Sequence, residues 1–190
     1  MFYRGGSKNY FSKDDLASFL YSAASNGHLN VVQHLIEGGV DINGLSGGNE
    51  TSAMMISSRY RFLDTVDYLI KAGGDLNITD KNGETALMYA INPLQGSGGE
   101  DKDNMEVIKL LVTSGANLKI RDRSGNTVFN HLILSNKVNV FDYLLKTLGE
   151  ENLLDSLNVE NALDIASIGT QRQYFLELLK NNGVKVNLPE

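Results

Sequence analysis

A short glycine-led segment recurs along the chain, and this recurrence constrains the fold more than any other feature. Residues 39–43 read Gly-Val-Asp-Ile-Asn, and residues 73–77, which lie 34 positions later, read Gly-Gly-Asp-Leu-Asn. Looser copies follow at residues 115–119 and 183–187. Self-similarity at a period of about 20 to 50 residues is typical of repeat proteins, in which each unit buries its apolar side against its neighbours.

Apolar stripes precede these segments at the spacing of a helix. Each stripe places apolar residues at positions i, i+1, i+4 and i+5 or a subset of these, which predicts a short helix with one buried face. The glycine that follows is the residue best suited to end such a helix. The fourth stripe lacks a glycine in register, so a longer helix or an irregular turn is expected there. The stripes are Val31, Val32, Leu35 and Ile36; Val66, Leu69 and Ile70; Val107, Ile108, Leu111 and Val112; and Val140, Phe141, Leu144 and Leu145.

A second group of positions opens each unit with turn residues and a helix cap. Residues 80–85 read Asp-Lys-Asn-Gly-Glu-Thr, and residues 122–127 read Asp-Arg-Ser-Gly-Asn-Thr. Asp and Gly favour turns, and Thr85 and Thr127 are placed to cap the helices that follow. Near the start of the chain, Ser12 and Asp15 have the spacing of a capping box. Each unit is therefore predicted to run turn, helix, loop, helix.

This order of motifs resembles the ankyrin repeat. The opening motif of that family, T-P-L-H-x-A, is matched by residues 85–90, its Gly-His pair by Gly27-His28, and its ending best by residues 73–77. The resemblance covers about residues 14–188 and implies an all-α solenoid of about five helix-turn-helix repeats with short β-turn fingers. The motif's histidine is replaced in each copy, which implies that packing of apolar side chains contributes more to stability. The predicted segments are a basic N-terminal extension at 1–13 and repeats at 14–45, 46–79, 80–121, 122–157 and 158–188.

Composition removes several classes of function. The 190 residues are 42% hydrophobic and 21% charged, as in globular proteins, and no apolar run approaches the length of a membrane span. There is no cysteine, the three histidines lack metal-ligand spacing, and no nucleophile motif is present. We therefore expect a cytoplasmic, monomeric protein that is not an enzyme and holds neither metal nor cofactor. The net charge of -6 argues against a nucleic-acid partner.

The third repeat is longer than the second. Thr51 and Thr85 are 34 residues apart, whereas Thr85 and Thr127 are 42 apart. The additional residues fall in the stretch 92–103, which contains Pro93 and several glycines, so a mobile loop outside the stack is predicted. A calcium loop starting at Asp101 is rejected because its twelfth position holds a valine rather than a glutamate.

The predicted function is non-catalytic binding of a partner protein or peptide on the concave face of the stack. Variable positions of the first helices and of the turns are expected to point outward there, and they are rich in Tyr, Met and Arg, which are frequent at binding hot spots. The arginines favour an acidic or phosphorylated peptide. The predicted contact residues are Met55, Arg59, Tyr60, Lys81, Tyr89, Asn92, Arg121, Arg123 and His131.

Three alternatives stay open at this stage. Met55 and Tyr89 could instead pack between repeats. The basic N-terminal arm and the turn arginines could bind an anion or a nucleic acid, which salt-dependent binding to DNA or RNA would reveal. The chain could also be an exported effector that targets a host protein.

Overall fold

The computed structural model of the chain describes residues 11–92, 101–135, 137–148, 177, 180 and 181. The chain divides into two compact units, Met1–Asn117 (unit 1) and Leu118–Glu190 (unit 2). Over the described residues the structure has eight helices and one small sheet, as the predicted all-α class requires. Residues 1–10 of the predicted extension and nearly all of the predicted fifth repeat lie outside the described residues. Within the described part, no helix has the length and apolar character needed to span a bilayer.

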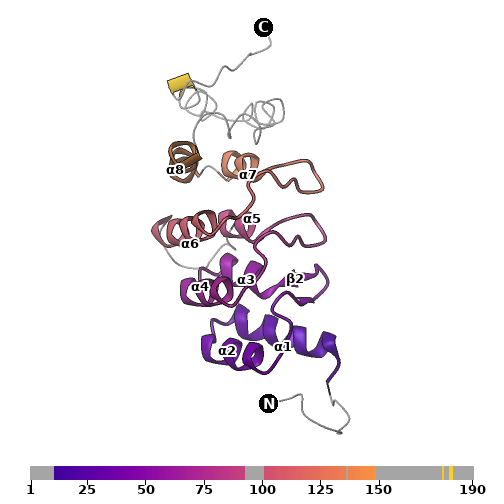
Figure 1. Ribbon diagram of the computed structural model, residues 1–190. Coiled ribbons are helices and arrows are strands. Elements are labelled where there is room, and N and C mark those ends of the chain that lie inside the picture. The colour runs from indigo at the N-terminus through magenta and orange to yellow at the C-terminus, as the bar shows by residue number, and fades with distance from the viewer. Residues whose placement is uncertain (1–10, 93–100, 136, 149–176, 178–179, 182–190) are drawn as a thin grey trace. The chain divides into compact units, whose positions relative to one another are not determined.

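Unit 1 is built from three helix pairs (Figure 1). The first helices pack side by side, α1 on α3 and α3 on α5, and the second helices do the same, α2 on α4 and α4 on α6. A two-residue antiparallel ladder between β1 and β2 forms a short finger ahead of α3. The bounds are α1 Lys13–Ser25, α2 Leu29–Glu37, β1 Leu45–Ser46, β2 Thr51–Ser52, α3 Ala53–Arg59, α4 Leu63–Lys71, α5 Ala86–Ile91 and α6 Asp101–Thr113.

The described part of unit 2 contains one helix pair, α7 Val128–Leu134 and α8 Val138–Leu148. The rings of Phe129 and Phe141 meet edge to face, with centroids 5.5 Å apart, and join the two helices. Helix α8 has 11 residues, whereas α2 and α4 have 9 each. The missing glycine after the fourth stripe thus accompanies a longer helix, as predicted.

The caps predicted at Ser12 and Thr85 are present, whereas Thr127, at the start of α7, makes no side-chain cap hydrogen bond and its hydroxyl donates to Asn130 Oδ1 instead. The Ser12 side chain accepts a hydrogen bond from the backbone of Asp15, whose carboxylate accepts one in return, and Thr85 Oγ1 accepts from the backbone of Met88. Gly39 and Gly73 have φ values of 91° and 87°, the left-handed conformation that glycine adopts at least cost. The stripe residues that precede these turns form the cores, with Val32, Val66, Leu69, Val107 and Leu111 fully buried.

The predicted loop at 92–103 needs a correction. Residues 93–100 lie outside the described residues, but residues 101–103, which were assigned to the loop, belong to α6. Helix α6 has 13 residues, four more than α4, and the four extra residues are at its start. No glycine or proline occurs between residues 101 and 113, so nothing in the local sequence opposes this extension.

Side-chain amides link the turns of neighbouring repeats in unit 1. Asn43 Oδ1 accepts a hydrogen bond from the backbone N–H of Asp75 at 2.9 Å, and Asn77 Oδ1 accepts one from the backbone N–H of Asn117 at 2.8 Å. Asp41 and Asp75 each accept from the backbone of the asparagine two positions later, which orients that asparagine. The recurring Asp-x-Asn segment therefore ties each repeat to the next.

Candidate functional site

Three of the predicted contact residues are buried. Met55 is 1% exposed, Tyr89 is 2% exposed and His131 is 7% exposed. The expectation that these side chains point outward to a partner is therefore wrong, and burial, the alternative left open for Met55 and Tyr89, is what the structure shows.

Tyr89 is held inside unit 1 by the carboxylate of Asp80. The Tyr89 hydroxyl donates to Asp80 Oδ2 at 3.0 Å, while Asp80 Oδ1 accepts from the backbone N–H groups of Asn82 and Glu84, both at 2.8 Å. Thr51 Oγ1 lies 3.4 Å from the same hydroxyl. Burial raises the pKa of Tyr89 above its usual value, so the phenol stays protonated as a hydrogen-bond donor.

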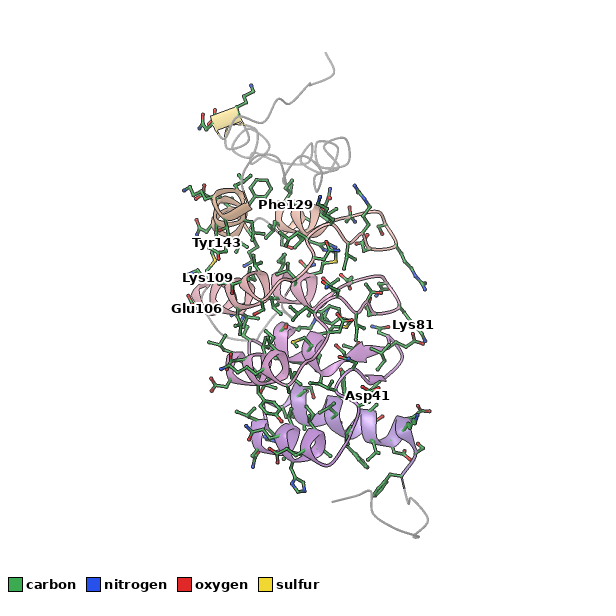
Figure 2. All side chains as sticks on the ribbon, in the orientation of Figure 1. Asp41, Lys81, Glu106, Lys109, Phe129 and Tyr143 are labelled. Atoms are coloured by element: carbon green, nitrogen blue, oxygen red, sulfur yellow. The ribbon has the colours of Figure 1, made fainter. Side chains whose placement is uncertain are left out.

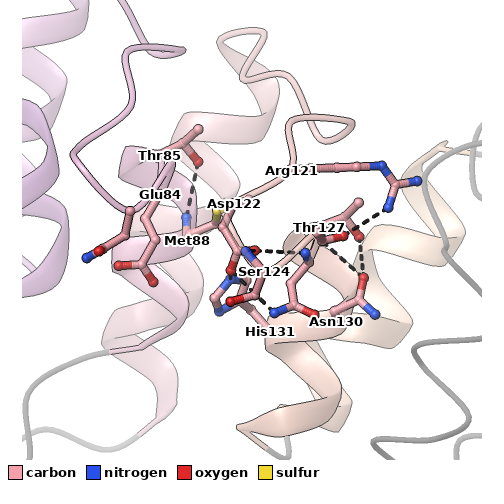
Figure 3. Close-up of polar contacts among 12 residues, drawn as sticks. Glu84, Thr85, Met88, Arg121, Asp122, Ser124, Thr127, Asn130 and His131 are labelled. Atoms are coloured by element: carbon pink, nitrogen blue, oxygen red, sulfur yellow. Dashed lines mark hydrogen bonds and ion pairs between the residues drawn. The ribbon is translucent and has the colours of Figure 1, made fainter.

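Unit 2 repeats this arrangement with a histidine (Figure 3). Asp122 Oδ1 accepts from the backbone N–H groups of Ser124 and Asn126, and Asp122 Oδ2 lies 3.0 Å from Nε2 of His131. In both units the ring follows its aspartate by nine residues. This recurring Asp-x8-ring spacing was visible in the sequence, and it is the signal that would have identified Tyr89 and His131 as structural residues.

Arg59 lies over the buried ring of Tyr89. The guanidinium carbon is 4.1 Å from the ring centroid, a cation–π contact between the end of α3 and the middle of α5. Arg59 is half-buried, and its Nε atom is shielded from solvent without a hydrogen-bond partner. Among the described residues its guanidinium has no ion-pair partner. The structure thus brings together two of the predicted residues, Arg59 exposed in part and Tyr89 beneath it.

The other predicted residues of unit 1 occupy different surroundings. Tyr60 is half-buried and stacks on Phe62, with ring centroids 6.0 Å apart. Lys81 is exposed at the tip of a turn and pairs with Glu50 at 3.4 Å (Figure 2). Asn92 is half-buried and follows the last residue of α5.

Unit 2 carries the remaining two predicted residues. Arg121 and Arg123 are exposed in the turn ahead of α7. Arg121 Nη1 donates to the carbonyl oxygen of Gly125 at 3.0 Å, which ties part of its guanidinium to its own turn (Figure 3).

Two comparisons with known protein families bear on this arrangement. Residues 20–97 match a family model of ankyrin repeats in three copies, and residues 82–123 match a model of the single ankyrin repeat, so the matches together span 20–123. The chain belongs to the ankyrin-repeat family. A comparison with curated proteins finds no match. The predicted family and the predicted helix-turn-helix fold with short β fingers are confirmed, and ankyrin repeats are generally protein–protein interaction modules.

One unusual residue of the second ankyrin repeat escaped the sequence analysis. Arg61 has a φ of 65°, in the left-handed region. It stands at the position of Gly27 in the first repeat, where φ is 67°. The next residue, Phe62, replaces the family histidine found at His28, and its ring would lie 2.8 Å from a Cβ atom added to Gly27. The alignment of Arg61-Phe62 with Gly27-His28, 34 residues earlier, was the sequence signal that could have revealed this unusual backbone.

The described residues hold no group of three or more His, Asp or Glu side chains placed to bind a metal ion. In the two polar clusters described above, an aspartate orders its own turn and forms a hydrogen bond with one ring side chain, Tyr89 or His131. Such a cluster stabilises the ankyrin turn, since each acceptor oxygen is used within the repeat.

Proposed function

We propose that this ankyrin-repeat protein is a non-catalytic module that binds a partner protein through the first-helix face of unit 1. This face is defined by Ser22 and Ser25 on α1, Arg59 at the end of α3, and Tyr60 directly after it. Ser25 matches Arg59 at the 34-residue offset, and Ser22 precedes Ser25 by one helical turn on the same side of α1. A cytoplasmic location and a monomeric state belong to the same proposal.

The observation that carries the proposal is the position of Arg59 on the Tyr89 ring. Arginine is one of the residue types enriched at binding hot spots. The ring beneath Arg59 is fixed by Asp80 and Thr51, so the guanidinium is held in place before any partner arrives. A side chain ordered in advance loses less conformational entropy on binding.

The second helices present a different surface. On α4, Lys71 pairs with Asp67 at 2.6 Å, and on α6, Lys109 pairs with Glu106 at 3.2 Å (Figure 2). These pairs are spaced by one helical turn and neutralise each other within their own helix, which is typical of a solvated face. The first-helix face is therefore the better candidate for the partner surface.

Site-specific photo-crosslinking tests this proposal. Benzoylphenylalanine is introduced at Ser22 or Tyr60 on the first-helix face and, as a matched control, at exposed Lys71 on α4. The proposal expects the two first-helix positions to crosslink one and the same protein in a lysate of the source cells, and the Lys71 position to crosslink none. Crosslinks formed only from Lys71, or salt-sensitive crosslinks from Ser22 and Tyr60 to nucleic acid, would contradict it.

A further inference from the structure

Arg59 is the described cation whose surroundings are most unusual in unit 1. Lysines of the unit lie next to carboxylates, Lys71 beside Asp67 and Lys81 beside Glu50. Within the described part of the chain, the guanidinium of Arg59 contacts the π face of Tyr89 and no carboxylate, although its Nε is withdrawn from water.

The nearby aspartate does not serve as a partner for Arg59. Asp80 Oδ1 accepts two backbone N–H groups, and Asp80 Oδ2 accepts the Tyr89 hydroxyl and lies 3.3 Å from Nδ2 of Asn82. A carboxylate offers about four acceptor positions, and these four donors fill them. Tyr89 therefore contacts Asp80, whose acceptors are occupied, through its hydroxyl and Arg59 through its ring, and no described residue accepts a hydrogen bond from Arg59 Nε.

This arrangement prepares Arg59 for an oxyanion. An aromatic ring face offers a cation its π electrons but no lone pair, so it leaves the N–H donors of the guanidinium available to an oxyanion. Partial removal from water strengthens any ion pair that the guanidinium forms, and the planar fork matches the two oxygens of a carboxylate.

We propose that Arg59, positioned by the ring of Tyr89, binds a carboxylate of an acidic segment in the partner protein. This inference rests on the proposed function, because it names the chemistry that the first-helix face recognises. Arg59 makes the direct contact, and Tyr89 acts as a positioning residue, because its ring lies against the guanidinium and its hydroxyl, bonded to Asp80, fixes the ring.

The test uses a random peptide display library selected against the full chain and against two variants with the same change in charge. Arg59→Gln removes the proposed contact, and Lys71→Gln removes one positive charge from the second-helix side. The full chain and Lys71→Gln should enrich peptides that contain Asp or Glu. Arg59→Gln should not enrich them, although its circular dichroism spectrum should show that it folds like the full chain.

A double-mutant cycle on one selected peptide locates the contact. Arg59→Gln should weaken binding of the peptide about tenfold or more, and replacing the peptide's key Glu by Gln should produce the same loss, with no further loss when both changes are combined. Additive losses would overturn the assignment. A third peptide carries phosphoserine in place of that Glu. If this peptide alone binds in a way that depends on Arg59, the group that Arg59 recognises is a phosphate and not a carboxylate.

Variants at Tyr89 separate positioning from folding. Tyr89→Phe keeps the ring and should bind the peptide more tightly than Tyr89→Leu, which removes the ring and should weaken binding several-fold. Arg59→Lys keeps the charge without the planar fork and should bind more weakly than the full chain. Equal binding by Tyr89→Leu and Tyr89→Phe would remove the positioning role.

Different experimental outcomes would contradict this inference and the proposed function. Selected peptides that crosslink to benzoylphenylalanine at Tyr60 but ignore Arg59→Gln would support the first-helix face and overturn the carboxylate contact. Selected peptides that crosslink only at Lys71, or a selection that yields no binding peptide, would contradict both.

Discussion

At the residue scale, one tyrosine couples the turn of the third repeat to its first helix. The Tyr89 hydroxyl donates to Asp80, and its ring lies 2% exposed beneath Arg59. Removing the hydroxyl leaves Asp80 Oδ2 with one weaker donor inside the protein. We therefore expect Tyr89→Phe to lower the free energy of unfolding by about 1–2 kcal/mol at neutral pH. Urea unfolding measures this change, and the matched control is Tyr68→Phe, since the hydroxyl of half-buried Tyr68 donates to no carboxylate among the described residues.

The unfolding free energies of the wild type and Tyr89→Phe should also depend differently on pH. Burial raises the pKa of Tyr89 in the folded state, so the unfolded chain deprotonates first, near its ordinary value of about 10. The stabilisation from the protonated phenol is fully present below that pH and is lost as the pH rises above it. The difference in unfolding free energy between the wild type and Tyr89→Phe should shrink above about pH 10. A difference that stays constant would contradict the burial of the phenol.

A second residue-scale prediction concerns the backbone at Arg61. A residue with a side chain is strained by about 1 kcal/mol or more in the left-handed region, and glycine is not. Arg61→Gly and Arg61→Ala both remove the side chain, but only the former relieves the backbone. We expect Arg61→Gly to be more stable than Arg61→Ala by about 1 kcal/mol in chemical denaturation. Equal stabilities would show that the backbone at this position carries no strain.

At the scale of the element, the outer side of α1 differs from the equivalent side of later helices. Phe19 and Leu87 occupy matching positions in repeats one and three, yet Phe19 is 44% exposed and Leu87 is 1% exposed. Phe19 also contacts the ring of Phe11, with centroids 5.1 Å apart. No earlier repeat is described ahead of α1, so the face that carries Phe19 has no helix pair packed on it in the described residues.

This contrast predicts unequal effects of truncation at one repeat position. Leu87→Ala should lower the unfolding free energy by about 2–5 kcal/mol because it leaves a cavity in a closed core. Phe19→Ala should cost less than half as much, since much of its ring already contacts solvent. Thermal or urea unfolding measures both. Similar losses would mean that the outer side of α1 is covered in solution.

Features that depend on residues close together in the sequence were predicted, and features that depend on more distant residues were not. The caps at Ser12 and Thr85 and the turns at Gly39 and Gly73 depend on residues within one turn of each other, and all were predicted. The orientation of Tyr89 depends on a buried partner nine residues away in the preceding turn, and an outward position was predicted wrongly.

The contact of Arg59 with Tyr89 joins neighbouring repeats through two residues that are 30 positions apart in sequence. The sequence proposed both residues for the binding surface, but it gave no sign that one would cover the other. Such a pair is decided by the packing of α3 on α5, which no local pattern of residue types specifies.

At the scale of the whole molecule, hydrogen bonds to asparagine side chains link each repeat of unit 1 to the next. Asn43 reaches the second turn and Asn77 reaches the third, while the matching position of the third turn holds Lys119. A lysine ammonium has no acceptor lone pair, so its side chain cannot accept an equivalent backbone N–H. The last such link therefore ends at Asn117, where unit 1 also ends.

The final prediction follows from this difference between matching positions. Asn77→Ala removes the acceptor for the Asn117 N–H and should lower the unfolding free energy by about 1 kcal/mol, because an exposed hydrogen bond contributes about that much. Coupling between neighbouring repeats should fall as well, so the urea transition should broaden and the Asn117 amide should exchange faster with deuterium. Lys119→Ala changes the same turn position without removing an acceptor, and it should leave both the transition width and that amide unchanged. If the two variants behaved alike, the Asn77 side chain would not couple neighbouring repeats, and this coupling in unit 1 would come from helix packing alone.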